Sequence, residues 1–194
     1  MMLAALSTFE PGRVRTDPPL EATGLGDVYA EHFRAVWRNL RRLGVPDHLL
    51  DDAVQDVFLV VHRRSADFAG RSSLKTWIFG IVLRVSKDYR RAARRHAARV
   101  ERYPEAIAVE PEASCPAEQA ARREASRLVH AILDRLDEQE RAVFVLVELE
   151  QLSVREAAEA TGLRLATCQR RLRRARAAFD LAVRRFGEQG RPVP

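Results

Sequence analysis

Cysteine is scarce in this chain, and long apolar runs are missing. Cys115 and Cys168 are the only two cysteines among 194 residues, and neither has a CxxC partner or a histidine at ligand spacing. The sequence therefore indicates no zinc site, no disulfide framework and no cofactor. No apolar run approaches the roughly 18 residues that span a bilayer. Residues 1–6 lack the basic start of a secretory signal, so we expect a cytoplasmic protein without membrane insertion.

The alternation of apolar and polar residues that marks a β-strand is also missing. Helical spacing recurs instead, so we predict an all-α protein of two small helical domains joined by a flexible linker. Prolines and glycines mark the segments that are not helical. The expected segments are an N-terminal arm at 1–26, a helical bundle at 27–98, a linker at 99–117, a helix-turn-helix domain at 118–186 and a tail at 187–194.

Apolar spacing and capping residues predict three helices in the bundle. The first begins at Asp27, and the second is capped by Asp47 and ends near Arg64. After a loop at 65–72, the third helix carries an apolar face and loses its pattern near Arg90.

Two further helices are expected before the segment that begins at Ser153. One covers residues 118–136, and the next is capped by Asp137, with Glu140 at the spacing of a capping box.

The pattern around Ser153 is typical of a helix-turn-helix. Ser153 and Glu156 have the spacing of a capping box, and Gly162 suits the left-handed turn into a second helix. The second helix is predicted to bury one apolar stripe: Leu165, Cys168, Leu172, Ala175, Phe179, Ala182 and Phe186.

Acidic residues are absent between Leu163 and Ala178, although this stretch is rich in arginine. An exposed helix usually mixes both signs of charge, so a charge of one sign indicates a polyanionic partner. The formal net charge of +6 and the isoelectric point near 10.1 agree with nucleic-acid binding. Arginine and glutamine also pair bidentately with base edges in the major groove.

An acidic surface interrupts this basic chain in the second predicted helix. Asp52, Gln55 and Asp56 lie three and four residues apart, which places them on one outward face. The apolar residues of the same helix are expected to face inward: Ala53, Val54, Val57, Phe58 and Val61. Ordinary solvation of a helix explains such a face as well as a binding site does, so both interpretations stay open.

The segment from Phe68 to Trp77 combines an aromatic ring, small hydroxyl side chains and cations. Such a set suits a single-stranded base, which stacks on a ring while cations hold its phosphate. The alternative is that Phe68 and Trp77 pack on the bundle core, and for Trp77 this is the better interpretation. The helix that follows interleaves basic and aromatic side chains, as nucleic-acid surfaces do: Arg84, Lys87, Asp88, Tyr89, Arg90 and Arg91.

The order of these features resembles a bacterial sigma factor of the extracytoplasmic-function group. The shared features are an acidic Asp-x-x-Gln-x-x-Phe helix, a Phe-x-Gly loop leading to Trp, a basic helix, a linker and a terminal helix-turn-helix. They extend from about Asp27 to Phe186. The resemblance implies a sigma region 2 bundle and a region 4 domain. It also implies three partners, which are core RNA polymerase (beta-prime clamp and beta flap), promoter DNA and an anti-sigma factor.

The resemblance also assigns residues to these partners. Polymerase docking falls to Asp52, Gln55, Asp56 and Phe58. Contacts with the minus-ten element fall to Phe68, Arg71, Ser72, Lys75, Trp77, Arg84, Lys87, Asp88 and Arg91. Contacts with the minus-thirty-five element fall to Arg164, Ala166, Thr167, Gln169, Arg170, Arg173 and Arg174.

Three positions depart from the family pattern. Arg84 replaces an asparagine that is frequent on the promoter-melting helix, and Val147 replaces an arginine that often reaches the promoter. Gln151 stands where a turn glycine is usual. These changes bear on promoter specificity and leave the class unchanged.

Two other classes of protein remain possible from the sequence. A one-component regulator would use the same helix-turn-helix with the bundle as a sensor or dimerisation unit, and it would not need the acidic face. An enzyme would need a metal on Asp51, Asp52, Asp56 and His62. We do not expect an enzyme, because these side chains provide too few ligands at one place.

Overall fold

The structure is a computed structural model that describes residues 24–100 and 129–189, here called the first block and the second block. Helices and no strand occur within these ranges, so the predicted all-α class is confirmed. The elements in chain order are α1 (Leu25–Arg42), the 3-10 turn η1 (Asp47–Leu49), α2 (Leu50–Arg63), the 3-10 turn η2 (Ser65–Asp67), α3 (Leu74–Val100), a helical stretch at 129–133, α5 (Glu138–Phe144), the π-helix η3 (Val145–Leu149), α6 (Val154–Thr161) and α7 (Leu165–Gln189).

Several predicted segments lie outside the described residues. They are most of the arm and of the linker, the start of the helix expected at 118–136, Cys115, and residues 190–194 of the tail.

The first block is a three-helix bundle held together by apolar stripes. The residues of α2 that were expected to face inward are all buried: Ala53, Val54, Val57, Phe58 and Val61. They pack with residues of α1 and α3 in one core cluster. Helical periodicity in the sequence therefore identified the buried face of α2 correctly.

The bounds of the first three helices differ from the prediction. Helix α1 begins at Leu25, so Asp27 lies within its first turn. Asp47 makes no side-chain cap; it starts a 3-10 turn and pairs with the Nε of Arg41 at 3.1 Å. Helix α3 continues to Val100, beyond the predicted end near Arg90, because arginine and alanine favour helix.

The second block differs in its first helical segments. The Asp137 carboxylate accepts a hydrogen bond from the Gln139 amide at 2.9 Å, but no capping box forms because Glu140 pairs with Arg174 at 3.1 Å. The backbone then widens into η3 before α6 begins.

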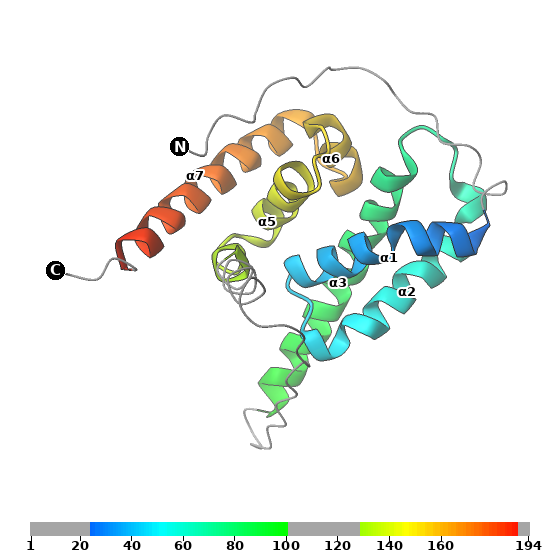
Figure 1. The fold of residues 1–194 in the computed structure, drawn as a ribbon, viewed down its shortest axis with the longest axis horizontal. Helices are drawn as coiled ribbons and strands as arrows, with labels where there is room; N and C mark the ends of the chain where they lie inside the picture. Colours follow the sequence, from blue (N-terminus) through cyan, green and yellow to red (C-terminus); the bar gives the residue numbers. More distant parts are fainter. Residues whose placement is uncertain (1–23, 101–128, 190–194) are drawn as a thin grey trace, which may run out of the picture.

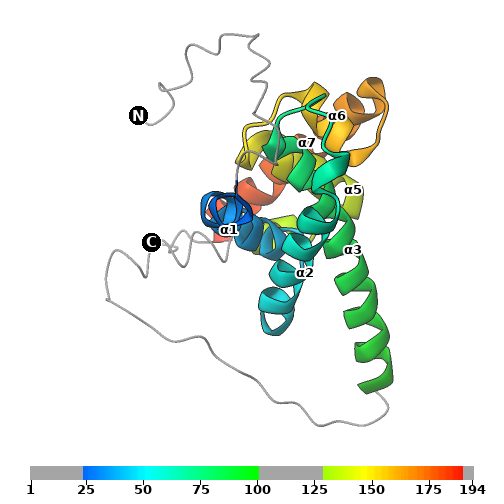
Figure 2. The same cartoon turned by 90° about the vertical axis from the view of Figure 1, so that its right-hand side faces the viewer.

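The two blocks pack against each other through α3. Figure 1 shows α1 and α2 on one side of α3 and the helices of the second block on the other, and α3 makes extensive contact with α6. One apolar cluster joins residues of both blocks, including Ile78 and Val82 of α3, Ala157 of α6 and Leu172 of α7. Figure 2 shows the C-terminal end of α3 projecting beyond the helices it packs against. The sequence predicted two domains but not this shared core.

Candidate polymerase and nucleic-acid interfaces

The acidic face of α2 is exposed, as the sequence predicted. Asp52, Gln55 and Asp56 are all exposed. The Tyr89 hydroxyl of α3 donates a hydrogen bond to Asp56 Oδ2 at 2.8 Å, which orients this carboxylate. Burial, together with the Asp56 carboxylate, raises the pKa of Tyr89 to about 12, so the hydroxyl keeps donating well into the alkaline range. Phe58 is buried at 6% exposure and supports this face from below.

A groove beside the acidic face was not found by sequence reasoning. It is lined by side chains of α1 and α2: Tyr29, Phe33, Asp51, Val54, Gln55, Phe58, Leu59 and His62. Tyr29 and Leu59 are 44% and 41% exposed, and the Tyr29 ring contacts Phe58 at 4.6 Å between centroids. Exposed large apolar side chains next to a polar face are typical of protein-binding surfaces.

The loop before α3 holds its aromatic residue against the bundle. The rings of Phe68 and Trp77 lie 5.5 Å apart, and both side chains are half-buried against the core cluster. Gly70 has φ 65°, a left-handed conformation that glycine adopts readily. Arg71 is exposed, and Ser72 is half-buried. Packing on the bundle core, the alternative interpretation for both residues, therefore accounts for the buried parts of Phe68 and Trp77.

Lys75 does not point freely into solvent. Its Nζ donates a hydrogen bond to the Glu150 carbonyl oxygen of the second block at 2.7 Å and lies 3.9 Å from Glu150 Oε2. Apart from the half-buried Trp77, the other predicted contacts on α3 are exposed: Arg84, Lys87, Asp88 and Arg91. Arg90 turns inward instead, with Nη1 donating to the Leu43 carbonyl at 2.9 Å and Nη2 2.6 Å from Glu138 Oε1.

The helix-turn-helix has the predicted local structure. Ser153 and Glu156 form a capping box, since the Glu156 amide donates to Ser153 Oγ at 3.2 Å and the Ser153 amide donates to Glu156 Oε2 at 2.8 Å. Gly162 ends α6 in the left-handed region with φ 68°. The capping box fixes the start of α6, and the turn at Gly162 leads the chain into α7.

The predicted minus-thirty-five residues lie on the outer side of α7 and the turn before it. All are exposed except Thr167, which is half-buried: Arg164, Ala166, Thr167, Gln169, Arg170, Arg173 and Arg174. Cys168, Leu172, Ala175 and Ala182 of the predicted stripe are buried and Phe179 is half-buried, while the side chain of Phe186 lies outside the described residues. Leu165 is 43% exposed, so its predicted inward position is wrong. Leu165 occupies the first turn of α7, where periodicity alone does not tell whether a neighbouring element covers the helix.

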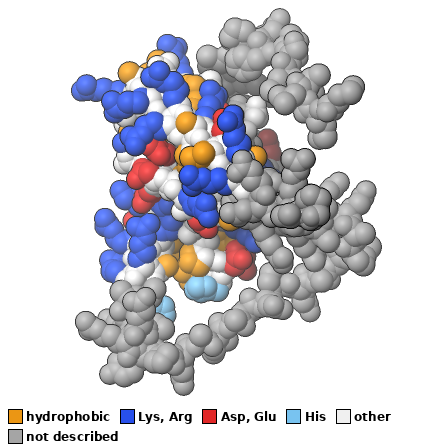
Figure 3. Space-filling view, turned by 90° about the vertical axis from the view of Figure 1, so that its left-hand side faces the viewer, with side chains coloured by type: hydrophobic (Ala, Val, Ile, Leu, Met, Phe, Trp, Pro, Cys, Tyr) orange, Lys and Arg blue, Asp and Glu red, His pale blue; other side chains and the backbone are white. Residues whose placement is uncertain are grey.

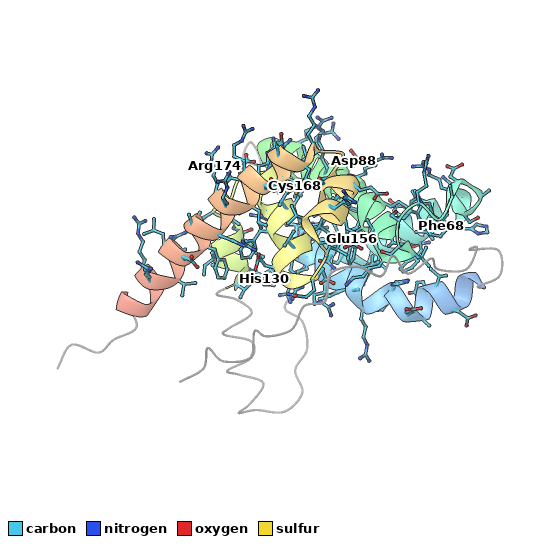
Figure 4. The ribbon with its side chains drawn as sticks, turned by 90° about the horizontal axis from the view of Figure 1, so that it is seen from above. Phe68, Asp88, His130, Glu156, Cys168 and Arg174 are labelled. Carbon is cyan, nitrogen blue, oxygen red and sulfur yellow. The ribbon has the colours of Figure 1, made fainter. Side chains whose placement is uncertain are left out.

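Figure 4 places Phe68 at one end of the molecule and Arg174 near the other, with Cys168 and Glu156 between them. On the face drawn in Figure 3, cationic side chains gather along one edge with acidic ones between them. The predicted nucleic-acid residues therefore belong to two separate surfaces in this arrangement.

Among residues 24–100 and 129–189, no group of histidine, cysteine and acidic side chains is placed to hold a metal ion.

Comparison with known proteins identifies the family. The model of sigma-70 region 2 matches residues 28–96, and the model of sigma-70 region 4 matches residues 126–179. The sigma factor SigM of Mycobacterium tuberculosis, of the extracytoplasmic-function group, is 30% identical over 84% of this chain and 82% of its own length. This chain belongs to the extracytoplasmic-function group of the sigma-70 family.

Other sigma factors share its sequence and fold. The sigma factor CnrH of Cupriavidus metallidurans is 32% identical over 80% of this chain and 84% of its own length. The structure of CnrH in complex with the cytosolic domain of CnrY superposes with a TM-score of 0.60 at 28% identity, covering 82% of this chain and 86% of that one. RpoE of Bartonella quintana, in complex with the anti-sigma factor NepR, shares the fold at 20% identity with a TM-score of 0.56, covering 81% and 97%.

The matched regions correspond to the two blocks of this sigma factor. Region 2 carries the acidic face of α2, the Phe68 loop and the basic part of α3, while region 4 carries the helix-turn-helix. None of the helices in the two described ranges combines the length and apolarity needed to cross a membrane.

Proposed function

We propose that this sigma factor docks on core RNA polymerase through the acidic face of α2. The observation that carries the proposal is the division of α2 into a fully buried apolar face and an exposed face of Asp52, Gln55 and Asp56. The protein carries a net charge of +6, so an ordered acidic face fits a basic protein surface and not DNA. The apolar groove of Tyr29 and Leu59 would extend this contact.

The recognition helix α7 would read the minus-thirty-five element. Arg170, Arg173 and Gln169 are exposed on one side of α7, next to the tight turn at Gly162. A helix in this position enters the major groove, where arginine pairs with guanine and glutamine with adenine. Arg164 and Arg174 would hold the flanking phosphates.

The first block would hold the melted minus-ten element. Exposed cations of α3 (Arg84, Lys87 and Arg91) would contact the backbone of the single strand, and the Phe68 ring would stack on an unpaired base. Opening the duplex costs a few kcal/mol per flipped base, and such stacking offsets part of it.

Each block alone is expected to bind duplex DNA weakly, because phosphate contacts are screened by salt. Attachment of both blocks to one polymerase makes the second contact intramolecular and raises the overall affinity.

The protein would act in the cytoplasm as an initiation factor that directs an enzyme and does no chemistry itself. An anti-sigma factor is a further expected partner, in keeping with the complexes of CnrH and RpoE.

The decisive experiment combines Asp52→Arg with Gln55→Ala and measures binding to core RNA polymerase. We expect binding to be lost with circular dichroism unchanged, because both side chains are exposed and contribute little to the core. Asp180→Arg is a matched control, since Asp180 is exposed on α7 far from this face along the chain. Undiminished affinity of the folded double variant would refute the proposal.

A second experiment tests the Phe68 loop. Phe68→Ala should spare holoenzyme assembly and impair transcription from duplex promoters, while a premelted promoter bubble restores part of the activity. Because the Phe68 ring also contacts Trp77, the thermal stability of the Phe68→Ala variant must be measured together with its transcription activity. Normal transcription from duplex promoter, or a collapse of stability, would mean that Phe68 acts only in packing.

A further inference from the structure

Leu165 is an exposed leucine in a cationic stretch of α7. Its side chain is 43% exposed in the first turn of the helix. The side chains that precede and follow it on the outer side of α7 are exposed as well: Arg164, Ala166, Gln169 and Arg170. No acidic residue occurs between Leu163 and Ala178. A large apolar side chain in such a place lacks the stabilisation that burial gives, so a contact outside the chain would supply it.

The backbone at the start of α7 holds Leu165 in its outward position. Leu163 is half-buried against the core cluster just before the helix, and Cys168 is fully buried in the first turns of α7, where Figure 4 labels it. Between these two inward residues, the amides of Thr167 and Cys168 donate to the Arg164 carbonyl oxygen at 2.9 and 3.0 Å. These hydrogen bonds fix the first turn, so the exposure of Leu165 belongs to an ordered helix.

Leu165 does not belong to a larger apolar surface. The other large apolar side chains exposed within residues 24–100 and 129–189 are Tyr29 and Leu59 of the first block and Leu181 and Val183 of α7. Leu181 lies about 24 Å from Leu165 along the helix axis, at about 1.5 Å per residue. A protein partner usually covers a contiguous apolar patch, so a single leucine among cations fits a different kind of partner.

The major groove of DNA presents one apolar group to such a side chain. Thymine alone among the four bases carries a methyl group there, at its C5 atom. Phosphates are bound by cations and by hydrogen-bond donors, and the other base edges by hydrogen-bonding groups, so a leucine adds nothing to these contacts. An apolar side chain on a helix in the major groove is therefore suited to recognise thymine.

The position of Leu165 relative to Gln169 indicates where this thymine lies. The two residues are four apart, so they share one side of α7. They are separated by about 6 Å along the helix axis, which corresponds to about two base-pair steps of about 3.4 Å. The amide of Gln169 is exposed and suits adenine. The two side chains would therefore contact an adenine and a thymine within about two base pairs of each other.

We propose that Leu165 is a specificity-determining residue of this sigma factor and that it recognises the C5 methyl group of a thymine in the minus-thirty-five element. The inference rests on the proposed reading of this element by α7. It adds to that reading a base feature that neither the arginines nor Gln169 can recognise, because their polar groups need hydrogen-bond partners. Burial of one methyl group corresponds to about a fourfold change in affinity.

Replacement of thymine by deoxyuridine tests this contact, because it removes the methyl group and keeps the base pair. The probe is a promoter duplex that the holoenzyme of core polymerase and the full chain selects from a library randomised at the minus-thirty-five element. Each thymine of the selected element is then replaced in turn. We expect the wild-type holoenzyme to lose about fourfold in affinity at one thymine. Leu165→Ala should bind the thymine and deoxyuridine duplexes equally at that position.

Two further substitutions separate the chemistry of the side chain from its size. Leu165→Met keeps an apolar group and should keep the sensitivity to the methyl group. Leu165→Gln has a similar length but a polar end, and it should lose this sensitivity. Leu181→Ala is the matched control, because Leu181 is 52% exposed on the same helix, and it should leave the response at every thymine unchanged.

The outcomes distinguish this inference from the proposed function. If no thymine of the selected element responds to the loss of its methyl group, or if the response persists in Leu165→Ala, the inference is wrong and the reading by α7 stands. An equal loss of affinity for core polymerase without DNA in Leu165→Ala would also overturn it, because Leu165 would then contact the polymerase. If the wild-type holoenzyme selects no sequence from the library, the proposed function fails and the inference fails with it. Should Leu165→Ala not fold by circular dichroism, the methionine and glutamine variants decide.

Discussion

Gln151 adopts a backbone conformation that is unusual for its side chain. Its φ is 59°, at the position where the family often has glycine, and its side-chain amide donates to the Glu148 carbonyl at 2.8 Å. A left-handed conformation costs a residue with a Cβ about 1–2 kcal/mol. We expect Gln151→Gly to raise the free energy of unfolding by about 0.5 kcal/mol, because the lost hydrogen bond and the greater entropy of glycine cancel part of the gain.

Gln151→Val supplies the comparison for this prediction. A β-branched residue is strongly disfavoured at positive φ, so this variant should lose about 1–2 kcal/mol. Denaturant unfolding of the three proteins measures both changes, and a valine variant as stable as the glycine variant would contradict the role of backbone strain.

Tyr89 provides a pH-dependent signal from the acidic face. Its pKa is raised to about 12 by burial and by its hydrogen bond to Asp56. The folded state favours the protonated phenol, so this contribution to stability is complete below pH 10 and is lost as the pH rises through about 12. A difference ultraviolet titration against Tyr89→Phe should show ionisation near pH 12. Asp56→Asn should lower the pKa of Tyr89 toward 10. If the pKa of Tyr89 is the same in Asp56→Asn as in the wild type, the hydrogen bond between the two side chains does not form.

At the scale of elements, α7 offers a direct test of base reading. Arg170 and Arg173 are exposed, and neither makes an ion pair among the described residues, whereas Arg174 pairs with Glu140 and Arg176 with Glu148. Arg170→Ala or Arg173→Ala should cost about 1–3 kcal/mol of binding and relax discrimination at one base pair. Binding to a set of minus-thirty-five variants measures this, with Arg184→Ala near the end of α7 as control. An equal loss on every sequence would indicate a phosphate contact instead.

At the scale of the whole molecule, the shared core predicts cooperative unfolding. Both tryptophans, Trp37 and Trp77, belong to the first block, so their fluorescence reports that block while circular dichroism reports the whole chain. One apolar cluster connects the blocks, so thermal transitions followed by the two signals should coincide. In Glu150→Lys the transitions should separate, because three cations of the first block surround this position and would repel the new lysine: Arg38, Arg42 and Lys75. Glu159→Lys is the control, and separate transitions already in the wild type would contradict a cooperative core.

Local patterns in the sequence determined the helices and their buried faces. The buried side of α2, the capping box of Ser153 and the turn at Gly162 were all predicted correctly, because they depend on residues three or four apart along one helix. The exposure of Asp52, Gln55 and Asp56 followed from the same spacing. The roles of these residues in polymerase binding stay predictions.

Only the tertiary structure decided which side chains of different helices are in contact. Lys75 and Arg42 reach Glu150 across 75 and 108 residues of sequence, and Arg90 reaches Leu43 across 47. The sequence shows Glu150 as one acid before a turn, and it shows Lys75 and Arg90 as members of a basic surface. Which side chain turns inward, and whether Leu165 is covered, depends on how the two blocks pack. That packing joins surfaces distant along the chain, so no periodicity within a single helix encodes it.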